Sequence, residues 1–183
     1  MTAATDFLSC YTPLASGDEI WGSPAYPQPL RLTWYRTHEA PPLALVTSVR
    51  AVVLQGDEVL VVREPNGKPY IIPGGRCAAK ESHEATVRRE VLEEVGWALG
   101  PLMPLGFAHL RNLGPCPPDH PYPYPDVFQT IYLADATEYR PEALTFDEWV
   151  ASSAFVPVAE ARQLPLRPGE LALLDAAVLL RRR

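Results

Sequence analysis

The sequence predicts a mixed α/β fold, in which helices cover both faces of a β-sheet. Two observations lead to this fold class. Short apolar, β-branched runs alternate with helical stretches along the chain, and the helical stretches are too few for a doubly wound parallel sheet. The chain has 183 residues, which suits one domain with a substantial buried core. A single mixed β-sheet with flanking helices therefore accounts best for the pattern.

The beginning of the chain differs from the rest. The first 45 residues are rich in proline and aromatic residues and show no long periodic pattern, so we expect an extended arm or a couple of short strands packed on the main body. We accordingly predict an N-terminal extension at residues 1–45 and a domain at residues 46–183. The domain opens with two apolar, β-branched runs, 46–54 and 58–63, and the intervening Gln55-Gly56-Asp57 is typical of a hairpin turn.

The strongest helical pattern in the chain covers residues 83–95. Ser82 stands where the helix needs an N-cap residue, and Gly96 stands where it needs a left-handed residue after its last turn. Before this helix a short strand is expected at residues 68–72, and Pro73-Gly74-Gly75 brings that strand to an end. A glycine turn of this kind lets the backbone approach a phosphate or a metal ion closely.

Two longer strands are expected at residues 102–113 and 127–134. They are separated by GPCPPDHPYPYPD, which has six prolines in thirteen residues and therefore predicts a stiff, exposed loop. The other expected elements are a last strand, a helical stretch and a final helix, at residues 155–158, 159–164 and 169–183 respectively.

Charge and cysteine content narrow the classes of function. The net charge is −6 and the one basic block is Arg181-Arg182-Arg183, so a surface for a nucleic-acid polymer is not expected, whereas a small anionic ligand that arrives with its own cation is compatible. Three cysteines without C-x-x-C spacing indicate neither a disulfide framework nor a zinc site and favour a reducing cytoplasm. We see no secretory signal and no apolar stretch long enough to span a bilayer, so no membrane partner is expected.

Three glutamates crowd one side of the helix predicted at residues 83–95. On a wheel of about 100° per residue, Glu90, Glu93 and Glu94 occupy an arc of roughly 100°, opposite the apolar side that holds Val91. Like charges this close repel each other, whereas a divalent cation such as Mg²⁺ reverses the sign, because carboxylate oxygens are its preferred ligands. The simpler alternative is a solvated acidic face on which Arg89 pairs with Glu93 at i+4.

The stretch from Gly75 to Trp97, GRCAAKESHEATVRREVLEEVGW, resembles the box of the Nudix hydrolases, G-x5-E-x7-R-E-U-x-E-E-x-G-U, where U is a bulky aliphatic residue. Trp97 departs from the aliphatic residue usual in the family, at a position that packs rather than reacts. The resemblance covers roughly residues 46–165 and implies an α/β/α sandwich. The residues that match the spacing of the box are Gly75, Glu81, Arg89, Glu90, Val91, Glu93, Glu94 and Gly96.

This resemblance implies a metal-dependent hydrolase. Glu90, Glu93 and Glu94 are expected to coordinate one or more Mg²⁺ or Mn²⁺ ions, with the Gly74 carbonyl as a further ligand. The ions would neutralise a diphosphate, polarise its phosphorus and lower the pKa of the attacking water.

The resemblance also implies supporting roles around the metal. Arg89 is expected to orient the glutamates beside it, and Glu81 to brace the turn. Members of the family differ over the general base, which is either a box glutamate, here Glu90, or a glutamate on a distant loop. The loop candidates in this sequence lie in EALTFDEWV, where Glu148 is the first choice and Glu142 the second.

The box says little about the substrate beyond its phosphates. The family hydrolyses compounds in which a nucleoside diphosphate is linked to another group, so an ADP-ribose-like nucleotide sugar or a nucleoside triphosphate is implied. Tyr122 or Tyr124 of the proline-rich loop offers a ring that stacks on a base, although a structural or dimer-contacting loop is the simpler interpretation. The HPYPYP segment is faintly similar to the QPWPFP stretch of NADH pyrophosphatases, but its distance from the box is longer and His replaces Gln.

A second class of function stays open. A protein with this fold can bind a nucleotide and regulate a partner without turnover. The complete charged set of the box favours the enzyme, because a sensor does not need all of it. A homodimer formed through the N-terminal arm or the sheet edges is compatible with the family.

Overall fold

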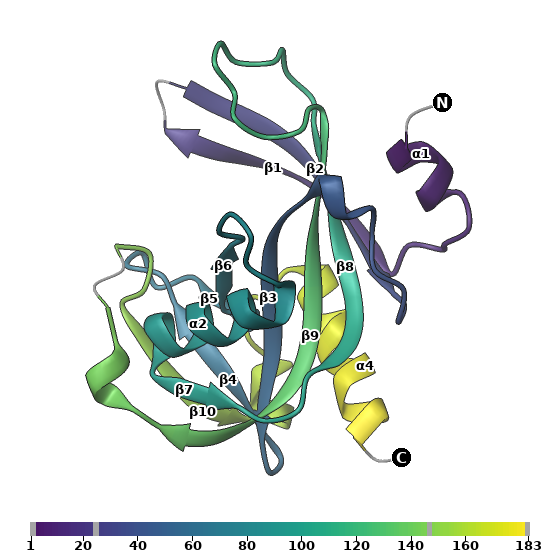
Figure 1. Cartoon of the computed structure of the whole chain (residues 1–183). Coiled ribbons are helices and arrows are strands. Elements are labelled where there is room, and N and C mark those ends of the chain that lie inside the picture. The colour runs from purple at the N-terminus through teal and green to yellow at the C-terminus, as the bar shows by residue number, and fades with distance from the viewer. Residues whose placement is uncertain (1–2, 24–25, 146–147, 182–183) are drawn as a thin grey trace.

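The protein is built on one mixed β-sheet, seen in a computed structural model that describes residues 3–23, 26–145 and 148–181 (Figure 1). Within these residues the strands are β1 (Ala15–Ser23), β2 (Tyr26–Arg36), β3 (Val46–Gln55), β4 (Glu58–Arg63), β5 (Pro69–Tyr70), β6 (Gly74–Arg76), β7 (Trp97–Leu99), β8 (Met103–Asn112), β9 (Asp126–Tyr139) and β10 (Ser152–Pro157). The main path through the sheet is β1-β2-β8-β9-β3-β4-β10. Neighbours on this path are antiparallel except β3 and β9, which run parallel.

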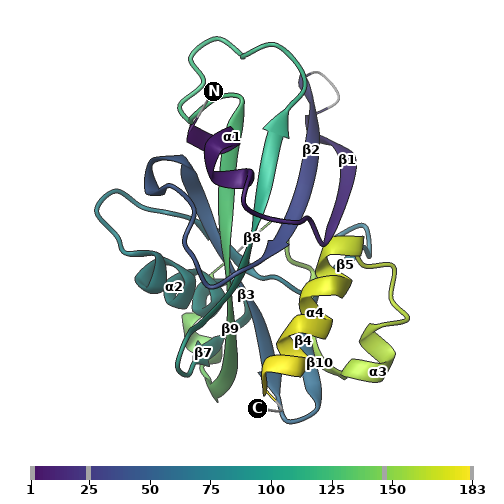
Figure 2. The same cartoon turned by 90° about the vertical axis from the view of Figure 1, so that its right-hand side faces the viewer.

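Helices lie on both sides of the sheet, which confirms the predicted fold class (Figure 2). Helix α2 (His83–Val95) packs buried valines on one face, and helix α4 (Pro168–Arg181) packs buried leucines on the other. No helix in the described part of the chain is long and apolar enough to cross a membrane. The remaining helical segments are α1 (Ala3–Leu8), α3 (Val158–Ala161) and the 3-10 turns η1 (Leu43–Leu45) and η2 (Pro141–Ala143).

The N-terminal segment forms longer strands than its composition predicts. Strands β1 and β2 have 9 and 11 residues, and β2 continues the main sheet by pairing with β8. The reason is the alternation of Leu30, Leu32 and Trp34, which are all buried in the core under α4. Helix α1, which the sequence analysis did not anticipate, adds Phe7 to a cluster with Phe107 and Phe128. The division of the chain at residue 45 stays a prediction.

Helix α2 begins and ends where its capping residues predict. The Ser82 hydroxyl accepts a hydrogen bond of 3.2 Å from the Ala85 amide, and Gly96 takes a left-handed φ of 75° as its amide donates to the Leu92 carbonyl at 2.9 Å. The strand expected before the helix is shorter than predicted, because only Pro69–Tyr70 pairs with β4. The glycine turn, in contrast, forms strand β6 against β3. Gly74 permits this pairing because a Cβ there would lie 2.3 Å from the Val49 carbonyl oxygen.

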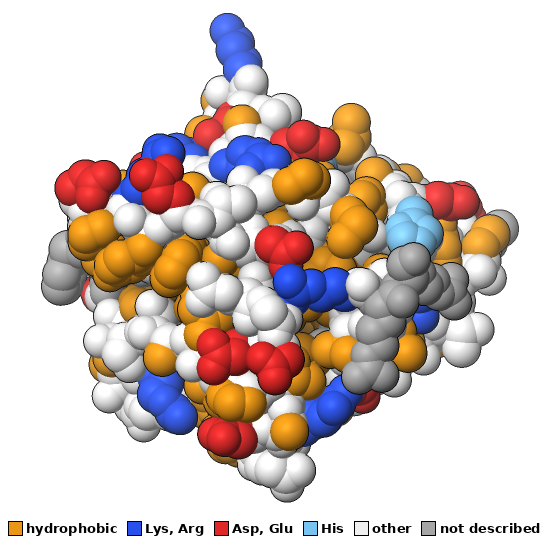
Figure 3. All heavy atoms as spheres, turned by 90° about the horizontal axis from the view of Figure 1, so that it is seen from below, with side chains coloured by type: hydrophobic (Ala, Val, Ile, Leu, Met, Phe, Trp, Pro, Cys, Tyr) orange, Lys and Arg blue, Asp and Glu red, His pale blue; other side chains and the backbone are white. Residues whose placement is uncertain are grey.

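The proline-rich loop lies between β8 and β9, as predicted, and runs beside the β1–β2 hairpin at the top of the molecule (Figure 1). The Leu113 amide joins the two by donating to the Pro29 carbonyl at 2.9 Å. At the opposite end, seen from below in Figure 3, acidic, basic and hydrophobic side chains are interspersed. That face therefore presents no block of one charge.

Candidate active site

Strand β6 and helix α2 are held together by the glycine turn of the box. The Gly74 amide donates a hydrogen bond of 2.7 Å to Glu94 Oε2, and the Tyr70 hydroxyl donates to Glu94 Oε1. The neighbouring Gly75 has no room for a side chain, because a Cβ there would lie 2.0 Å from Glu90 Oε2. Two of the three box glutamates are thus positioned against the two glycines of the turn.

Arg89 is the centre of an ion-pair network on the same face of α2. Its Nε and Nη2 form a fork on the two oxygens of Glu81 at 2.9 and 2.8 Å, and its Nη1 donates to Glu90 at 2.7 Å and to Glu93 at 3.1 Å. The Thr86 hydroxyl donates to Glu81 as well, at 2.8 Å. The Arg89 fork and this hydroxyl lower the pKa of Glu81 to about 2, and the carboxylates raise the pKa of Arg89. Both groups are therefore charged at neutral pH.

The donor set fits a hard divalent cation in its chemistry. Carboxylates at Glu90, Glu93 and Glu94 share one helix face, and Glu90 and Glu93 each use a single oxygen on Arg89, which leaves lone pairs for a cation. In this arrangement of side chains, no group of three acidic, histidine or cysteine residues in the described segments forms a ready-made metal cage. One carboxylate of the expected metal site is already positioned, because the Glu90 carboxylate occupies the space beside Gly75.

The loop candidates for the general base lie on the segment between β9 and β10, which meets the C-terminal end of α2. The segment after β9 is joined to this end of the helix, since the Arg140 amide donates to the Gly96 carbonyl at 2.7 Å and the Thr145 amide donates to the Glu93 carbonyl at 2.9 Å. Glu142, in η2, and Glu148, on the turn before β10, are both exposed. The described residues include no hydrogen-bond or ion-pair partner for Glu148.

A small cavity of about 130 Å³ adjoins the glycine turn. Its wall includes Arg76, the residue after Gly75, together with Tyr122, whose ring centre is 4.3 Å from the Arg76 guanidinium carbon. Of the two tyrosines considered for substrate binding, Tyr122 therefore lines a cavity next to the box. The other, Tyr124, donates its hydroxyl to the Gly114 carbonyl and stays within the loop.

Several residues of this region escaped the sequence analysis. Tyr70 and Arg76 flank the glycine turn in the sequence, so their closeness to the motif is a signal that was available. Trp21 and Gln129 also line the cavity, but they come from β1 and β9, and no local pattern marks them. Trp97, in contrast, packs as expected, with ring centres 5.0 Å from Tyr139 and 5.2 Å from Phe155.

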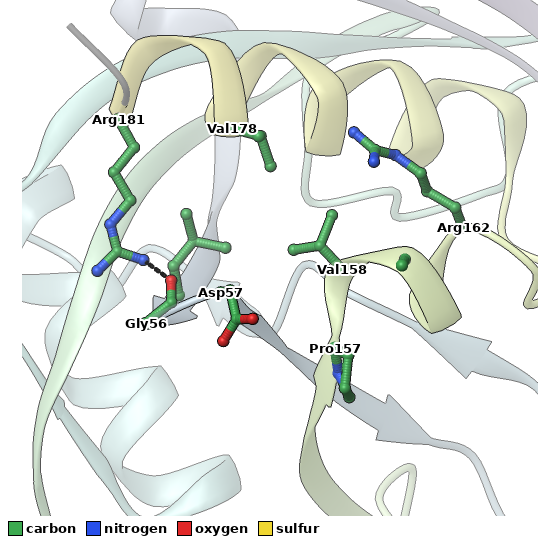
Figure 4. Close-up of a pocket in the computed structure, with 9 residues that line it drawn as sticks. Gly56, Asp57, Pro157, Val158, Arg162, Val178 and Arg181 are labelled. Carbon is green, nitrogen blue, oxygen red and sulfur yellow. Dashed lines mark hydrogen bonds between the residues drawn. The ribbon is translucent and has the colours of Figure 1, made fainter.

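A larger pocket of about 460 Å³ lies elsewhere, between α4, α3 and the β3–β4 turn (Figure 4). Its two arginines already have partners: Arg162 is bound to Asp175 at 2.8 Å, and Arg181 to Asp135 at 2.9 Å. The lining includes no residue of the box. We therefore place the candidate active site at the glycine turn and α2.

Fold and site together define a class of protein. It is an α/β protein in which a glycine turn next to the central sheet contacts the carboxylates on one face of a helix. The family model described as NUDIX domain matches residues 44–177. The chain therefore belongs to the Nudix family. No curated protein sequence matches it.

Solved structures give the same fold at low sequence identity. A NUDIX hydrolase from Nitrosomonas europaea is 22% identical over 73% of this chain and 89% of its own, with a TM-score of 0.56. A mutant pyrophosphohydrolase from Bacillus subtilis is 17% identical over 90% and 96% of the two chains, with a TM-score of 0.58. An ADP-ribose pyrophosphatase from Streptococcus suis is 20% identical over 74% and 91%, with a TM-score of 0.50. At these identities the likeness establishes the fold alone.

Proposed function

We propose that the protein is a metal-dependent pyrophosphohydrolase that cleaves a nucleoside diphosphate linked to another group, such as a nucleotide sugar or a nucleoside triphosphate. The observation that carries the proposal is the Glu90 carboxylate, which fills the space where any other residue than Gly75 would place a Cβ. At Gly75 the lack of a side chain leaves room for the Glu90 carboxylate, and the backbone of the same turn can approach a phosphate closely. This combination supports a site for a metal ion and a phosphate.

In this proposal Glu90, Glu93 and Glu94 hold Mg²⁺ or Mn²⁺, with the Gly74 carbonyl as a further ligand. When bound, the metal neutralises the diphosphate and lowers the pKa of the attacking water. Arg89 forms ion pairs with Glu90 and Glu93, so the two carboxylates are oriented before a cation binds.

Glu81 braces the turn in the same proposal. Its carboxylate accepts from Arg89 and from the Ala78 amide, at 3.4 Å, so it links the segment before α2 to the helix. Gly96 supports the site by ending α2 in a tight turn. A side chain would not fit there, because a Cβ at Gly96 would lie 2.8 Å from the Tyr139 ring.

For the general base we propose Glu148, with Glu90 as the other candidate. Support for Glu148 comes from the tie between Thr145 and the Glu93 carbonyl, which fixes the start of its loop to α2. Turnover of Glu148→Gln should fall about 100-fold with little change in KM, and that of the matched Glu142→Gln should not change. Equal turnover in both variants would assign the base to Glu90 instead.

The test of the proposed function is a panel of nucleotide sugars and nucleoside triphosphates, incubated with Mg²⁺ and followed by chromatography of the products. A nucleotide sugar should yield a nucleoside monophosphate, and a triphosphate should yield a monophosphate plus pyrophosphate. Glu93→Gln and Glu94→Gln should abolish turnover, whereas Glu84→Gln, which changes an exposed residue in the first turn of the same helix, should keep it. Glu93 is the cleaner probe, because Glu94 also holds Tyr70 and Gly74.

A panel in which nothing is hydrolysed, while a nucleotide raises the melting temperature, would favour a nucleotide-binding regulator instead. A cytoplasmic location and a homodimer stay predictions from the sequence and the family.

A further inference from the structure

The Glu94 carboxylate accepts a hydrogen bond at each of its oxygens, and both donors come from the segment that leads into the glycine turn. The Tyr70 hydroxyl donates to Oε1, and the Gly74 amide donates to Oε2 at 2.7 Å. Glu90 and Glu93, in contrast, each use one oxygen on the same guanidinium. A carboxylate that is held at both oxygens cannot rotate while the two bonds last. Tyr70 and Gly74 thus form a clamp that fixes the orientation of Glu94.

Both donors of the clamp are themselves anchored in the sheet. Tyr70 on β5 is in register with Val62 on β4, and Gly74 on β6 is in register with Arg50 on β3. The Tyr70 side chain is 8% exposed and belongs to the core cluster that includes Val91 of α2. Because close packing restricts the rotamers of a buried ring, the hydroxyl stays directed at the carboxylate on α2.

The Tyr70 hydroxyl is not needed to fill the core, because phenylalanine has the same ring. Tyr132 of β9 lies in the same core cluster, and among the described residues its hydroxyl has no hydrogen-bond partner. The Tyr70 hydroxyl, in contrast, is bonded to the Glu94 carboxylate. Removal of this hydroxyl therefore leaves the shape of the ring unchanged and takes the donor away from Glu94 Oε1.

The clamp brings Glu94 to the same turn as Glu90. Gly74, which donates to Glu94, is followed directly by Gly75, beside which the Glu90 carboxylate lies. Successive Cα atoms are about 3.8 Å apart, so the two carboxylates contact neighbouring residues of one turn. A carboxylate oxygen that accepts one hydrogen bond keeps a lone pair, so the clamped Glu94 can still coordinate a cation.

We propose that Tyr70 is a positioning residue whose hydroxyl, through Glu94, makes the metal site select Mg²⁺ or Mn²⁺ over the larger Ca²⁺. The proposal rests on the proposed function, since it takes Glu94 to be a ligand of the metal. Mg²⁺ requires nearly ideal octahedral geometry with bonds of about 2.0–2.1 Å, whereas Ca²⁺ accepts flexible ligands at about 2.3–2.6 Å. A carboxylate of fixed orientation therefore suits the smaller ion. Without the hydroxyl the carboxylate can rotate, and the advantage of the smaller ion is reduced.

The test is binding of Mn²⁺, followed by electron paramagnetic resonance of the free ion, and displacement of the bound Mn²⁺ by Mg²⁺ or Ca²⁺. It gives three dissociation constants on protein without nucleotide, at a temperature well below the melting temperature of each variant. In Tyr70→Phe the affinities for Mn²⁺ and Mg²⁺ should fall about tenfold, and the affinity for Ca²⁺ should fall less than about threefold. Tyr132→Phe, which removes a hydroxyl without a described partner from the same core cluster, is the matched control and should keep all three constants.

A double-mutant cycle separates positioning of Glu94 from a general loosening of the fold. If the hydroxyl acts through Glu94, adding Tyr70→Phe to Glu94→Gln should change the Mn²⁺ affinity less than about twofold. The proposal is overturned if Tyr70→Phe binds all three ions as the wild type does, or if it loses affinity for Ca²⁺ as strongly as for Mg²⁺. A tenfold loss of Mn²⁺ affinity on adding Tyr70→Phe to Glu94→Gln would overturn it as well.

The positioning role and the proposed function can fail separately, because the ions are titrated without substrate. Ion affinities that follow the expected pattern in a protein that hydrolyses no nucleotide would refute the proposed function alone. Hydrolysis that depends on Mg²⁺, together with unchanged ion affinities in Tyr70→Phe, would refute the positioning role alone.

Discussion

Adjacent glycines in the turn before α2 should respond to alanine in opposite ways. In Gly75→Ala the new Cβ meets Glu90 Oε2 at 2.0 Å, and an ordinary contact needs about 3.4 Å, so the carboxylate must move by roughly 1.4 Å. The displaced group is the end of a flexible side chain, so we expect a loss of stability of only about 0.5–1.5 kcal/mol. Misplacing a catalytic group by about 1 Å costs about 100-fold in rate, or about 2.7 kcal/mol.

Gly74→Ala meets backbone instead. Its Cβ would lie 2.3 Å from the Val49 carbonyl oxygen, and Gly74 has a φ of 134°, which residues with a side chain rarely adopt. The strand pairing of β6 has to break to relieve this contact, so we expect a loss of at least about 3 kcal/mol in the free energy of unfolding. Gly74→Ala should therefore unfold at a lower urea concentration than the wild type, whereas Gly75→Ala should fold and lose catalytic activity.

The assays are urea unfolding and turnover of the best substrate with Mg²⁺. Gly17→Ala is the matched control, because a Cβ at Gly17 meets no atom within 4 Å. It should leave both measurements within error of the wild type. The reasoning is refuted if Gly75→Ala turns over at the wild-type rate, or if it is destabilised as strongly as Gly74→Ala.

Three further outcomes follow from the hydrogen bonds and charges. Tyr70→Phe removes a donor from the Glu94 carboxylate and should cost about 1–3 kcal/mol, seen as a fall of several degrees in the melting temperature; an unchanged value would count against this contact. Burial raises the pKa of Glu170 above 4.5, so its contribution to stability is full below pH 4.5 and is lost as the pH rises through the raised pKa. Glu170→Gln should therefore gain stability relative to the wild type in unfolding measured from pH 4.5 to 8, and a constant difference would contradict the sign. In Arg89→Lys, which cannot form the fork, carboxyl NMR titration should find the pKa of Glu81 raised from about 2 toward 4.5, and a value that stays near 2 would show that the fork is not its cause.

The sequence allows α2 and the turn before it to be predicted because their determinants are local. Ser82, Gly96 and the spacing of the apolar residues define the helix within fifteen residues, and the box fixes which side chains share its outer face. The contact of Gly75 with Glu90 is also short in range, since only fourteen residues of turn and helix lie between the two.

The wall of the cavity could not be predicted in the same way. Trp21 and Gln129 line the same cavity only because β1 pairs with β2, β2 with β8 and β8 with β9, and such registers depend on the packing of the whole sheet. The prolines before Leu30 concealed the alternation that makes β2 a strand. The partner of Glu94 was missed for a related reason, because Tyr70 reaches it from the short strand β5 across the turn.

Binding of Mn²⁺, followed by electron paramagnetic resonance of the free ion, tests most directly whether the carboxylates of α2 hold a catalytic metal. The wild type and Glu84→Gln should bind the ion with the same affinity, whereas Glu90→Gln and Glu93→Gln should bind it at least about tenfold more weakly and lose turnover in parallel. Unchanged Mn²⁺ affinity in Glu90→Gln and Glu93→Gln, or hydrolysis that continues after chelation of all divalent metal, would contradict the assignment.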